Sequence, residues 1–195
     1  RPISIRITNF LLKTNVTPNQ ITVLSFIIKI LGSALFLFNK SILAGILIYL
    51  SHVFDCVDGE IARVKKEMKS SGALLDYFLD RLSDVFMYFS ITLAIFWSKG
   101  NMYILLIGIF VIAANFFMTD IAQKVNTLKK KENMPPTMGK FSYFHYGGSA
   151  NTMIILLASI TNQLLMGIVV VGSLSFIYTF VKFIKSYLEM RKIKA

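Results

Sequence analysis

Long apolar runs limit what this chain can fold into more than any other feature of its sequence. The chain is 55% hydrophobic and only 16% charged, and several of its runs approach the roughly 20 apolar residues that cross a bilayer as a helix. We predict six spans, over residues 19–38, 41–54, 73–97, 102–122, 144–161 and 163–184. The sequence therefore predicts an all-α integral membrane protein with six transmembrane helices.

The first residues form a different kind of segment. One helical face of residues 1–14 is apolar (Ile3, Ile7, Phe10, Leu11) and the opposite face is polar (Arg6, Asn9, Lys13). Such a helix is expected to lie in the membrane interface. Thr17 followed by Pro18 then marks a new helix start. We predict an interfacial amphipathic helix over residues 1–16 and one six-span domain over residues 17–195.

Basic residues are unevenly distributed between the two ends of the predicted spans. Most of the 21 Lys and Arg residues fall on the side of the chain start, whereas Lys40 and Lys99 are the only ones at the opposite ends. The positive-inside rule places the basic side in the cytoplasm, together with both termini. Membrane topology and anionic headgroups account for the net charge of +11, so we expect no nucleic-acid partner.

Most of the ten acidic residues lie between residues 55 and 84, between two membrane-grade apolar segments. Asp55 and Asp58 are spaced i, i+3, and Asp76 and Asp80 are spaced i, i+4, so each pair falls on one face of a helix. Carboxylates at a membrane are expensive and mark function. Four that can converge at the cytoplasmic edge predict a divalent-metal site.

Two other interpretations of these acids fit the sequence less well. A solvated acidic face fits poorly, because the acids are concentrated in one segment of a basic chain. A divalent-cation transporter would also use intramembrane carboxylates. It fits less well, because the acids lie at the cytoplasmic end with no matching set on the far side.

The acids belong to a longer pattern, Asp55-x2-Asp58-Gly59-x2-Ala62-Arg63-x8-Gly72-x3-Asp76-x3-Asp80. This pattern resembles the signature of the CDP-alcohol phosphotransferase (CDP-alcohol phosphatidyltransferase) family at all eight fixed positions, with the same gaps. The resemblance implies an enzyme that transfers a substituted phosphate group from a CDP-alcohol to an acceptor hydroxyl and releases CMP. It also implies a homodimer.

The resemblance implies roles for individual residues. The implied metal ligands, for two Mg²⁺ ions with Mn²⁺ as the alternative, are Asp55, Asp58, Asp76 and Asp80, and Asp80 is also the implied general base. The implied nucleotide site comprises Gly59, Ala62, Arg63 and Gly72, with Pro18 and Asn19 at the start of the first span. Without the motif, helix packing would explain the glycines and snorkelling at the membrane edge would explain the arginine.

Other charged residues have simpler expected roles. Asp84 is expected to pair with Lys29 or Arg81, and His52 to be a satisfied helix histidine. A basic loop is predicted over residues 124–140, where Lys140 and Lys124 are candidate ligands of the acceptor's phosphate. Lys140 is the first choice because Gly139-Lys140 resembles a Gly-Lys of the family. Asp120 and Lys124, spaced i, i+4, are expected to form an ion pair.

The substrates are less constrained than the reaction. The opening residues resemble the start of the membrane half of fusions with an upstream cytidylyltransferase, and the sequence does not begin with Met. We therefore expect a polar polyol phosphate product of the di-myo-inositol phosphate type, with a fused domain before Arg1. The alternative is a phospholipid synthase that uses CDP-diacylglycerol and an inositol phosphate or glycerol phosphate acceptor.

Overall fold

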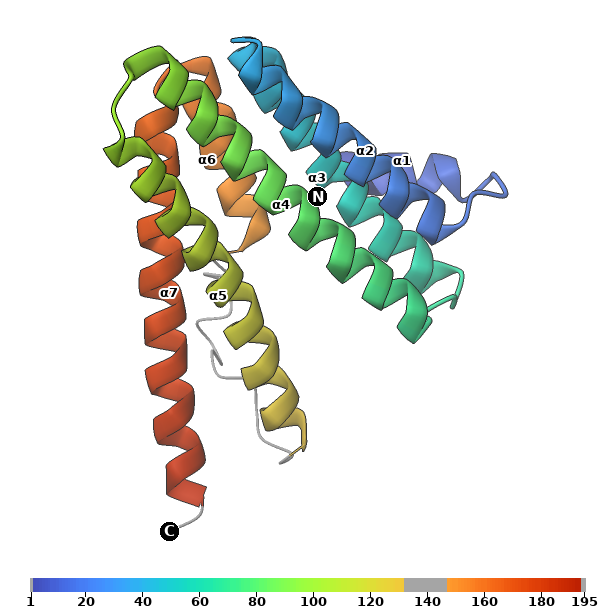
Figure 1. The fold of residues 1–195 in the computed structure, drawn as a ribbon. Helices are drawn as coiled ribbons and strands as arrows, with labels where there is room; N and C mark the ends of the chain where they lie inside the picture. The colour runs from blue at the N-terminus through green and yellow to red at the C-terminus, as the bar shows by residue number, and fades with distance from the viewer. Residues whose placement is uncertain (1, 132–146, 194–195) are drawn as a thin grey trace.

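The computed structural model describes residues 2–131 and 147–193, and these residues form seven α-helices (Figure 1). The helices are α1 (Pro2–Leu11), α2 (Pro18–Leu37), α3 (Ser41–Val64), α4 (Ser70–Lys99), α5 (Tyr103–Lys131), α6 (Gly148–Ile160) and α7 (Leu164–Ile193). The predicted all-α class is confirmed for this part of the chain. The start of α2 is as expected, because Pro18 occupies its first turn and the Thr17 N–H donates to Oε1 of Gln20.

Four helices in the described ranges, α2, α3, α5 and α7, are long and apolar enough to cross a membrane by length and composition. The sequence predicts six. Helix α4 has 30 residues, but the charged side chains of the motif lower its hydropathy. Helix α6 has 13 residues, or about 20 Å at 1.5 Å per residue, which is short of a bilayer core. It begins at Gly148 rather than at residue 144.

Two helices extend beyond their predicted spans. Helix α3 runs without a break to Val64, so Asp55 and Asp58 continue the same helix as the apolar run. Helix α5 continues to Lys131, so the first part of the predicted loop over residues 124–140 is helical. Pro135 and Pro136 lie outside the described residues.

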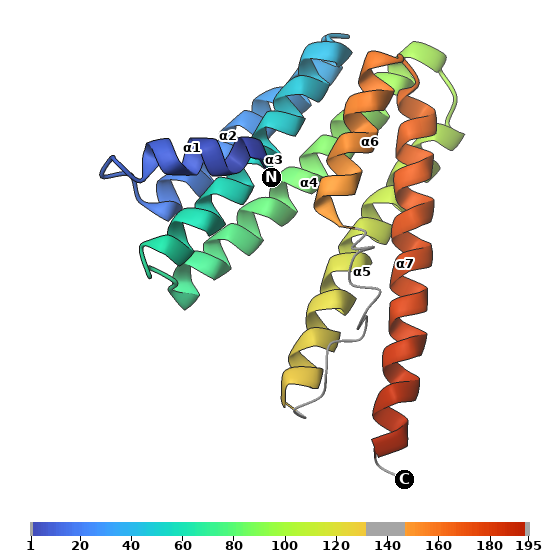
Figure 2. The same ribbon diagram turned by 180° about the vertical axis from the view of Figure 1, so that it is seen from behind.

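Helix α4 crosses the molecule diagonally and packs against α2 on one side and against α5 and α7 on the other, while α6 packs against α3 and α7 (Figures 1 and 2). A shared core joins these helices, and its fully buried members include Phe36, Ile48, Ile91, Val111, Ile155 and Ile168. Gly108 on α5 faces Thr92 on α4 so closely that a Cβ atom would overlap its side chain. The second half of α4 is therefore tightly packed, and it anchors the first half, which carries the motif residues.

The connections α2–α3, α4–α5 and α6–α7 lie at one end of the molecule (Figure 1). Each contains a residue with positive φ: Asn39, Gly100 and Asn162 respectively. Gly100 ends α4 in the left-handed conformation that favours glycine. The α3–α4 connection lies at the opposite end, so the two halves of the aspartate motif run antiparallel and meet near that end.

Helix α1 lies across α3 (Figure 2). Ile7 and Leu11 pack against a small core of Ile21, Val57 and Ile61. The predicted apolar face is therefore split, because Phe10 is 70% exposed. The buried side of α1 also has polar residues: the hydroxyls of Ser4 and Thr8 both donate to the carboxylate of Glu60. An interfacial position of α1 stays a prediction.

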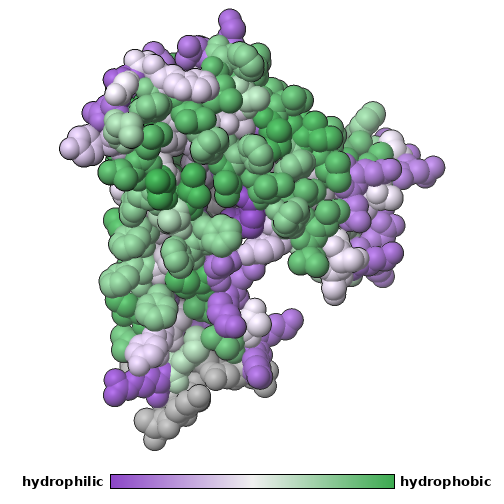
Figure 3. Space-filling model, viewed as in Figure 1, coloured by the Kyte–Doolittle hydropathy of each residue, from purple (hydrophilic) through white to green (hydrophobic). Residues whose placement is uncertain are grey.

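Apolar side chains cover most of the outer surface in the view of Figure 3. Hydrophilic side chains gather where the molecule is hollowed, between the α5–α7 leg and the α2–α3–α4 group. Exposed apolar side chains with an enclosed polar hollow are what a lipid-embedded protein requires, because lipid tails cannot satisfy polar groups.

Candidate active site

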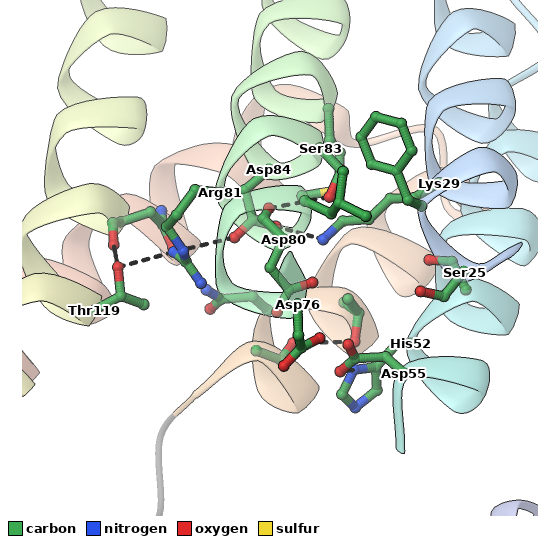
Figure 4. A pocket seen from close by; sticks show the side chains of 18 of the residues that line it. Ser25, Lys29, His52, Asp55, Asp76, Asp80, Arg81, Ser83, Asp84 and Thr119 are labelled. Carbon is green, nitrogen blue, oxygen red and sulfur yellow. Dashed lines mark hydrogen bonds and ion pairs between the residues drawn. The ribbon is translucent and has the colours of Figure 1, made fainter. Parts of the chain in front are cut away.

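Three of the motif carboxylates meet in one cavity. The cavity has a volume of about 230 Å³ and is lined by residues of α2, α3, α4, α5 and α6. Asp55 on α3, with Asp76 and Asp80 on α4, line it and each offer one oxygen within 4.8 Å of the others (Figure 4). The helical spacing that suggested convergence from the sequence thus brings these three together.

The three carboxylates fit a divalent cation. Oδ1 of Asp76 is buried and has no hydrogen-bond partner in the described residues. A buried acceptor without a partner is costly, and three anionic groups this close repel one another. Carboxylate oxygens are also the ligands that Mg²⁺ and Mn²⁺ prefer. A bound divalent ion would remove both penalties.

Asp58 is placed differently from the other three. It is 6% exposed, and its Oδ2 accepts a 2.7 Å hydrogen bond from Oγ1 of Thr22 on α2. It does not belong to the group of three whose oxygens lie within 4.8 Å, although it lines an adjoining cavity together with Asp76. Its role as a metal ligand stays a prediction.

This second cavity has a volume of about 190 Å³. All six predicted nucleotide-site residues line it: Pro18, Asn19, Gly59, Ala62, Arg63 and Gly72. Asp76 and Thr22 line both cavities. The sequence motif therefore corresponds to two adjoining cavities with one carboxylate common to both.

Cations lie behind the carboxylate group. Lys29 Nζ on α2 lies 2.6 Å from Oδ1 of Asp84, and Nη1 of Arg81 lies 3.3 Å from Oδ2 of the same residue (Figure 4). Arg81 also donates to Oγ1 of Thr119 on α5. The expected pairing of Asp84 is confirmed, with both cations rather than one.

His52 is a partnered residue, as expected. Its Nε2 lies 2.8 Å from Oγ of Ser149 on α6, and its Nδ1 lies 3.8 Å from Oδ2 of Asp55. It is not part of the group of three that could hold a metal. The contact with Ser149 links α6 to the edge of the cavity.

Of the two predicted acceptor lysines, Lys124 alone lies in the described part of the chain. Lys124 on α5 is exposed and lines neither of the two cavities, and Lys140 lies outside the described residues. The expected ion pair of Asp120 with Lys124 is wrong, because Asp120 accepts a 2.5 Å hydrogen bond from the Tyr77 hydroxyl on α4.

Sequence reasoning did not identify several polar residues that support the site. Thr22, Thr119 and Ser149 each bond a motif or cavity residue on another helix. The sequence held one weak signal for Thr22. This residue lies one helical turn after Pro18, which belongs to the predicted nucleotide site. Hydroxyl residues in membrane helices usually bond their own backbone, so their type alone does not predict such a role.

Comparison with known proteins agrees with this geometry. The family model of CDP-alcohol phosphatidyltransferase matches residues 15–182. An archaetidylinositol phosphate synthase of Pyrococcus horikoshii is 29% identical over 188 residues, which cover 95% of this chain and 92% of the relative. A bifunctional IPC transferase and DIPP synthase of Archaeoglobus fulgidus is 33% identical over 146 residues, covering 75% of this chain and 27% of the relative.

Solved structures share the fold. Phosphatidylinositol phosphate synthase of Mycobacterium tuberculosis with CDP-DAG bound has a TM-score of 0.76 at 18% identity, over 96% of this chain and 94% of that one. The same protein in complex with manganese and citrate has a TM-score of 0.77 at 18% identity, over 94% and 88% of the two chains. The match over residues 15–182 favours an enzyme over a cation transporter, and this membrane protein belongs to the CDP-alcohol phosphatidyltransferase family of phosphotransferases.

Proposed function

We propose that this protein carries out metal-dependent transfer of a substituted phosphate group from a CDP-alcohol to an acceptor hydroxyl, with release of CMP. The observation that carries the proposal is the position of Asp76 between the two cavities. A donor held in the second cavity would present its phosphates at the carboxylate group. An acceptor in the first cavity would approach the same group from the other side.

The second cavity suits the CMP half of the donor. Gly59 and Gly72 give it walls without side chains, and Ala62 adds only a methyl group. Arg63 supplies a guanidinium, whose planar donors match a phosphate. Asn19 adds an amide from the start of α2. Their meeting at one cavity supports the nucleotide roles implied by the motif.

We assign the metal to Asp55, Asp76 and Asp80, with Asp58 as the fourth ligand. Two Mg²⁺ ions, or Mn²⁺, would neutralise charge on the pyrophosphate so that an acceptor hydroxyl can approach it. Asp58 is held by Thr22 and lies beside the second cavity, so it suits an ion on the nucleotide side. The structural relative in complex with manganese supports a divalent ion in this fold.

The chemical step needs one proton acceptor. The acceptor's hydroxyl oxygen bonds to the β-phosphorus while the bond from that phosphorus to the bridging oxygen breaks. CMP leaves with the bridging oxygen, and the hydroxyl proton passes to a carboxylate oxygen of Asp80. Asp80 lines the first cavity, where an acceptor would enter, and no described residue forms an ion pair or hydrogen bond with its carboxylate.

The first cavity suits a small polar acceptor. Charged, hydroxyl and amide side chains line much of it, among them Ser25, Lys29, Ser51, Thr119, Asn151 and Thr152. Such a lining fits a polyol phosphate better than an acyl chain. The relatives named as inositol-lipid or DIPP synthases agree with an inositol phosphate as the acceptor.

The donor's alcohol separates two candidate products. CDP-inositol would give the di-myo-inositol phosphate type, which the similarity to the bifunctional synthases supports. CDP-diacylglycerol or a related CDP-lipid would give a phospholipid. The Pyrococcus relative supports this second candidate, because the chain matches nearly its whole length. Lys140 and Lys124 stay candidates for the acceptor's phosphate.

A donor panel tests the proposal. Purified protein is supplied with CDP-diacylglycerol, CDP-inositol or CDP-glycerol, each with inositol phosphate or glycerol phosphate and Mg²⁺, and CMP release is measured. Turnover of one donor identifies the product class. Flux of Mg²⁺ or Mn²⁺ into vesicles without CMP release from any donor would contradict the assignment.

We also propose that the six predicted spans, which include α2 to α7, cross the membrane, with both termini and the active site in the cytoplasm. The concentration of basic residues at the motif end supports this orientation. A homodimer and an upstream cytidylyltransferase domain are proposed from family resemblance. A mass measurement in mild detergent tests the dimer, and a single cysteine placed at residue 40 or 124 in a Cys56→Ser background tests the topology.

A further inference from the structure

Asp80 and Asp84 lie one turn apart on α4 and line the same cavity, but their carboxylates have different surroundings. Both oxygens of Asp84 face cations, Lys29 at 2.6 Å and Arg81 at 3.3 Å. The carboxylate of Asp80 has no ion-pair or hydrogen-bond partner in the described ranges and belongs to the group with Asp55 and Asp76. The carboxylate of Asp84 is held by two cations, whereas that of Asp80 lies with the other carboxylates (Figure 4).

Helical spacing alone would not produce this difference. Carboxylates at i, i+4 are neighbours on a helix surface and repel each other, the more so where water is scarce. With no cation beside it, Asp84 would be a further oxygen ligand one turn from Asp80 and would compete for the metal. The ion pair removes Asp84 from that competition.

Lys29 is the cation that comes from another helix. Its side chain is 12% exposed, and it reaches the cavity from the middle of α2, an apolar helix in which it is the only charged residue. Arg81 has further contacts, with Thr119 and with the ring of Tyr77. The position of Asp84 relative to α2 therefore depends on Lys29.

We infer that Lys29 is a positioning residue for catalysis: by pairing with Asp84, it keeps that carboxylate out of the metal group and leaves Asp80 available to the metal and the acceptor. The inference rests on the proposed function of the first cavity. Removing the charge of Lys29 alone and removing the charge of Asp84 alone should have opposite effects on the metal group. Lys29→Met leaves an extra carboxylate beside the metal group, whereas Asp84→Asn leaves a buried ammonium that can pair with Asp80 or Asp55.

The test uses Lys29→Met, Asp84→Asn and the double variant, with Lys99→Met as the matched control at an exposed position in the last turn of α4. Mn²⁺ binding is measured by calorimetry on purified protein without substrate. We expect Asp84→Asn to weaken binding by about tenfold or more, because close charged groups couple strongly. Lys29→Met should bind Mn²⁺ at least as tightly as the parent, and the double variant should recover most of the lost affinity.

Steady-state CMP release gives the second measurement. We expect kcat to fall by about tenfold or more in each single variant, while KM for the CDP-alcohol stays near the parent value because the donor cavity is untouched. The double variant should be faster than either single variant, and Lys29→Arg, which keeps the charge, should be faster than Lys29→Met. A purely structural ion pair would also couple the two variants, but it would leave the Mn²⁺ affinity of Asp84→Asn unchanged.

Two results would overturn the inference: a double variant as slow as the product of the single losses, or unchanged Mn²⁺ affinity in Asp84→Asn. If Lys29→Met does not fold, the comparison of Asp84→Asn with the double variant decides in the same way. Failure of the proposed function is a separate result, since a parent protein that turns over no CDP-alcohol can still show the Mn²⁺ pattern.

Discussion

The backbone of Gly72 lies against the side chain of Asn19, so that a Cβ atom at residue 72 would stand 3.0 Å from Oδ1 of that amide. Gly72 is in the first turn of α4 and Asn19 in the first turn of α2, and both line the second cavity. Gly59 differs, because its nearest neighbour, Nη1 of Arg63, would lie at an ordinary 3.5 Å. A side chain is therefore excluded more strongly at residue 72 than at residue 59.

Gly72→Ala should raise KM for the CDP-alcohol, because the added methyl group pushes Asn19 away from its position at the nucleotide site. Overpacking of this kind costs about 1–3 kcal/mol, so a change on the order of tenfold is expected. Gly59→Ala is the control and should have a smaller effect. Initial rates of CMP release against donor concentration measure both, and equal increases in KM would contradict the steric argument.

Chelation of divalent ions should abolish CMP release, and Mg²⁺ or Mn²⁺ should restore it. Asp55→Asn, Asp58→Asn and Asp76→Asn should each remove this metal-dependent activity while the helices stay folded, because each removes one charge from the metal group. Circular dichroism and gel filtration check folding. Ordinary activity in any one variant would remove that residue from the ligand set. The ligand role of Asp58 has the least geometric support, because Asp58 lies outside the group of three.

Asp80→Asn should suppress turnover while CDP-alcohol binding is kept. The other acids remain to hold an ion, and the second cavity is unchanged. Loss of a general base typically slows a reaction by about 10²–10⁴-fold, and a simultaneous loss of metal contact would add to this. Binding and turnover are measured on one preparation. If binding disappears together with turnover, Asp80 is chiefly a metal ligand.

The convergence of the motif residues could be predicted from the sequence because it depends on short spacings along the chain. A spacing of four residues places Asp76 and Asp80 on one helix face, and the antiparallel course of α3 and α4 follows from the short connection between them. The cavity around Gly59 and Arg63 is formed by these two helices together with the start of α2. The cost of charge near a membrane, rather than any one residue, indicated that these groups act together.

What the sequence did not predict depends on contacts between distant segments. Thr22 bonds Asp58 across 36 residues, and nothing in the sequence near Thr22 indicates that partner. The span over residues 102–122 was predicted to end before α5 does. The helix continues to Lys131 through a lysine-rich stretch, which the apolar pattern does not reveal. Helix α1 was expected to present its whole apolar face to the membrane, but packing on α3 takes part of that face and leaves Phe10 exposed.

Glu60 holds α1 by hydrogen bonds and directly follows Gly59 of the motif. The contact therefore links α1 to the candidate site. The Ser4 and Thr8 hydroxyls donate to its two carboxylate oxygens at 2.9 and 2.6 Å. Hydrogen bonds to a charged group are worth about 1.5–3 kcal/mol each, and a half-buried carboxylate that loses them is penalised further. Two such bonds hold a ten-residue helix whose apolar contacts with the small core come from Ile7 and Leu11.

The double variant Ser4→Ala, Thr8→Ala should therefore release α1 and raise amide hydrogen exchange there by about tenfold or more, while α4 to α7 stay protected. Thr161→Ala is the matched control, because that hydroxyl bonds only within its own turn at the far end of the molecule. KM for the CDP-alcohol should also rise, since Glu60 is the next residue after Gly59, which lines the second cavity. If exchange in α1 is unchanged, the apolar contacts of Ile7 and Leu11 suffice to dock the helix, and Glu60 would then act on the nucleotide site without α1.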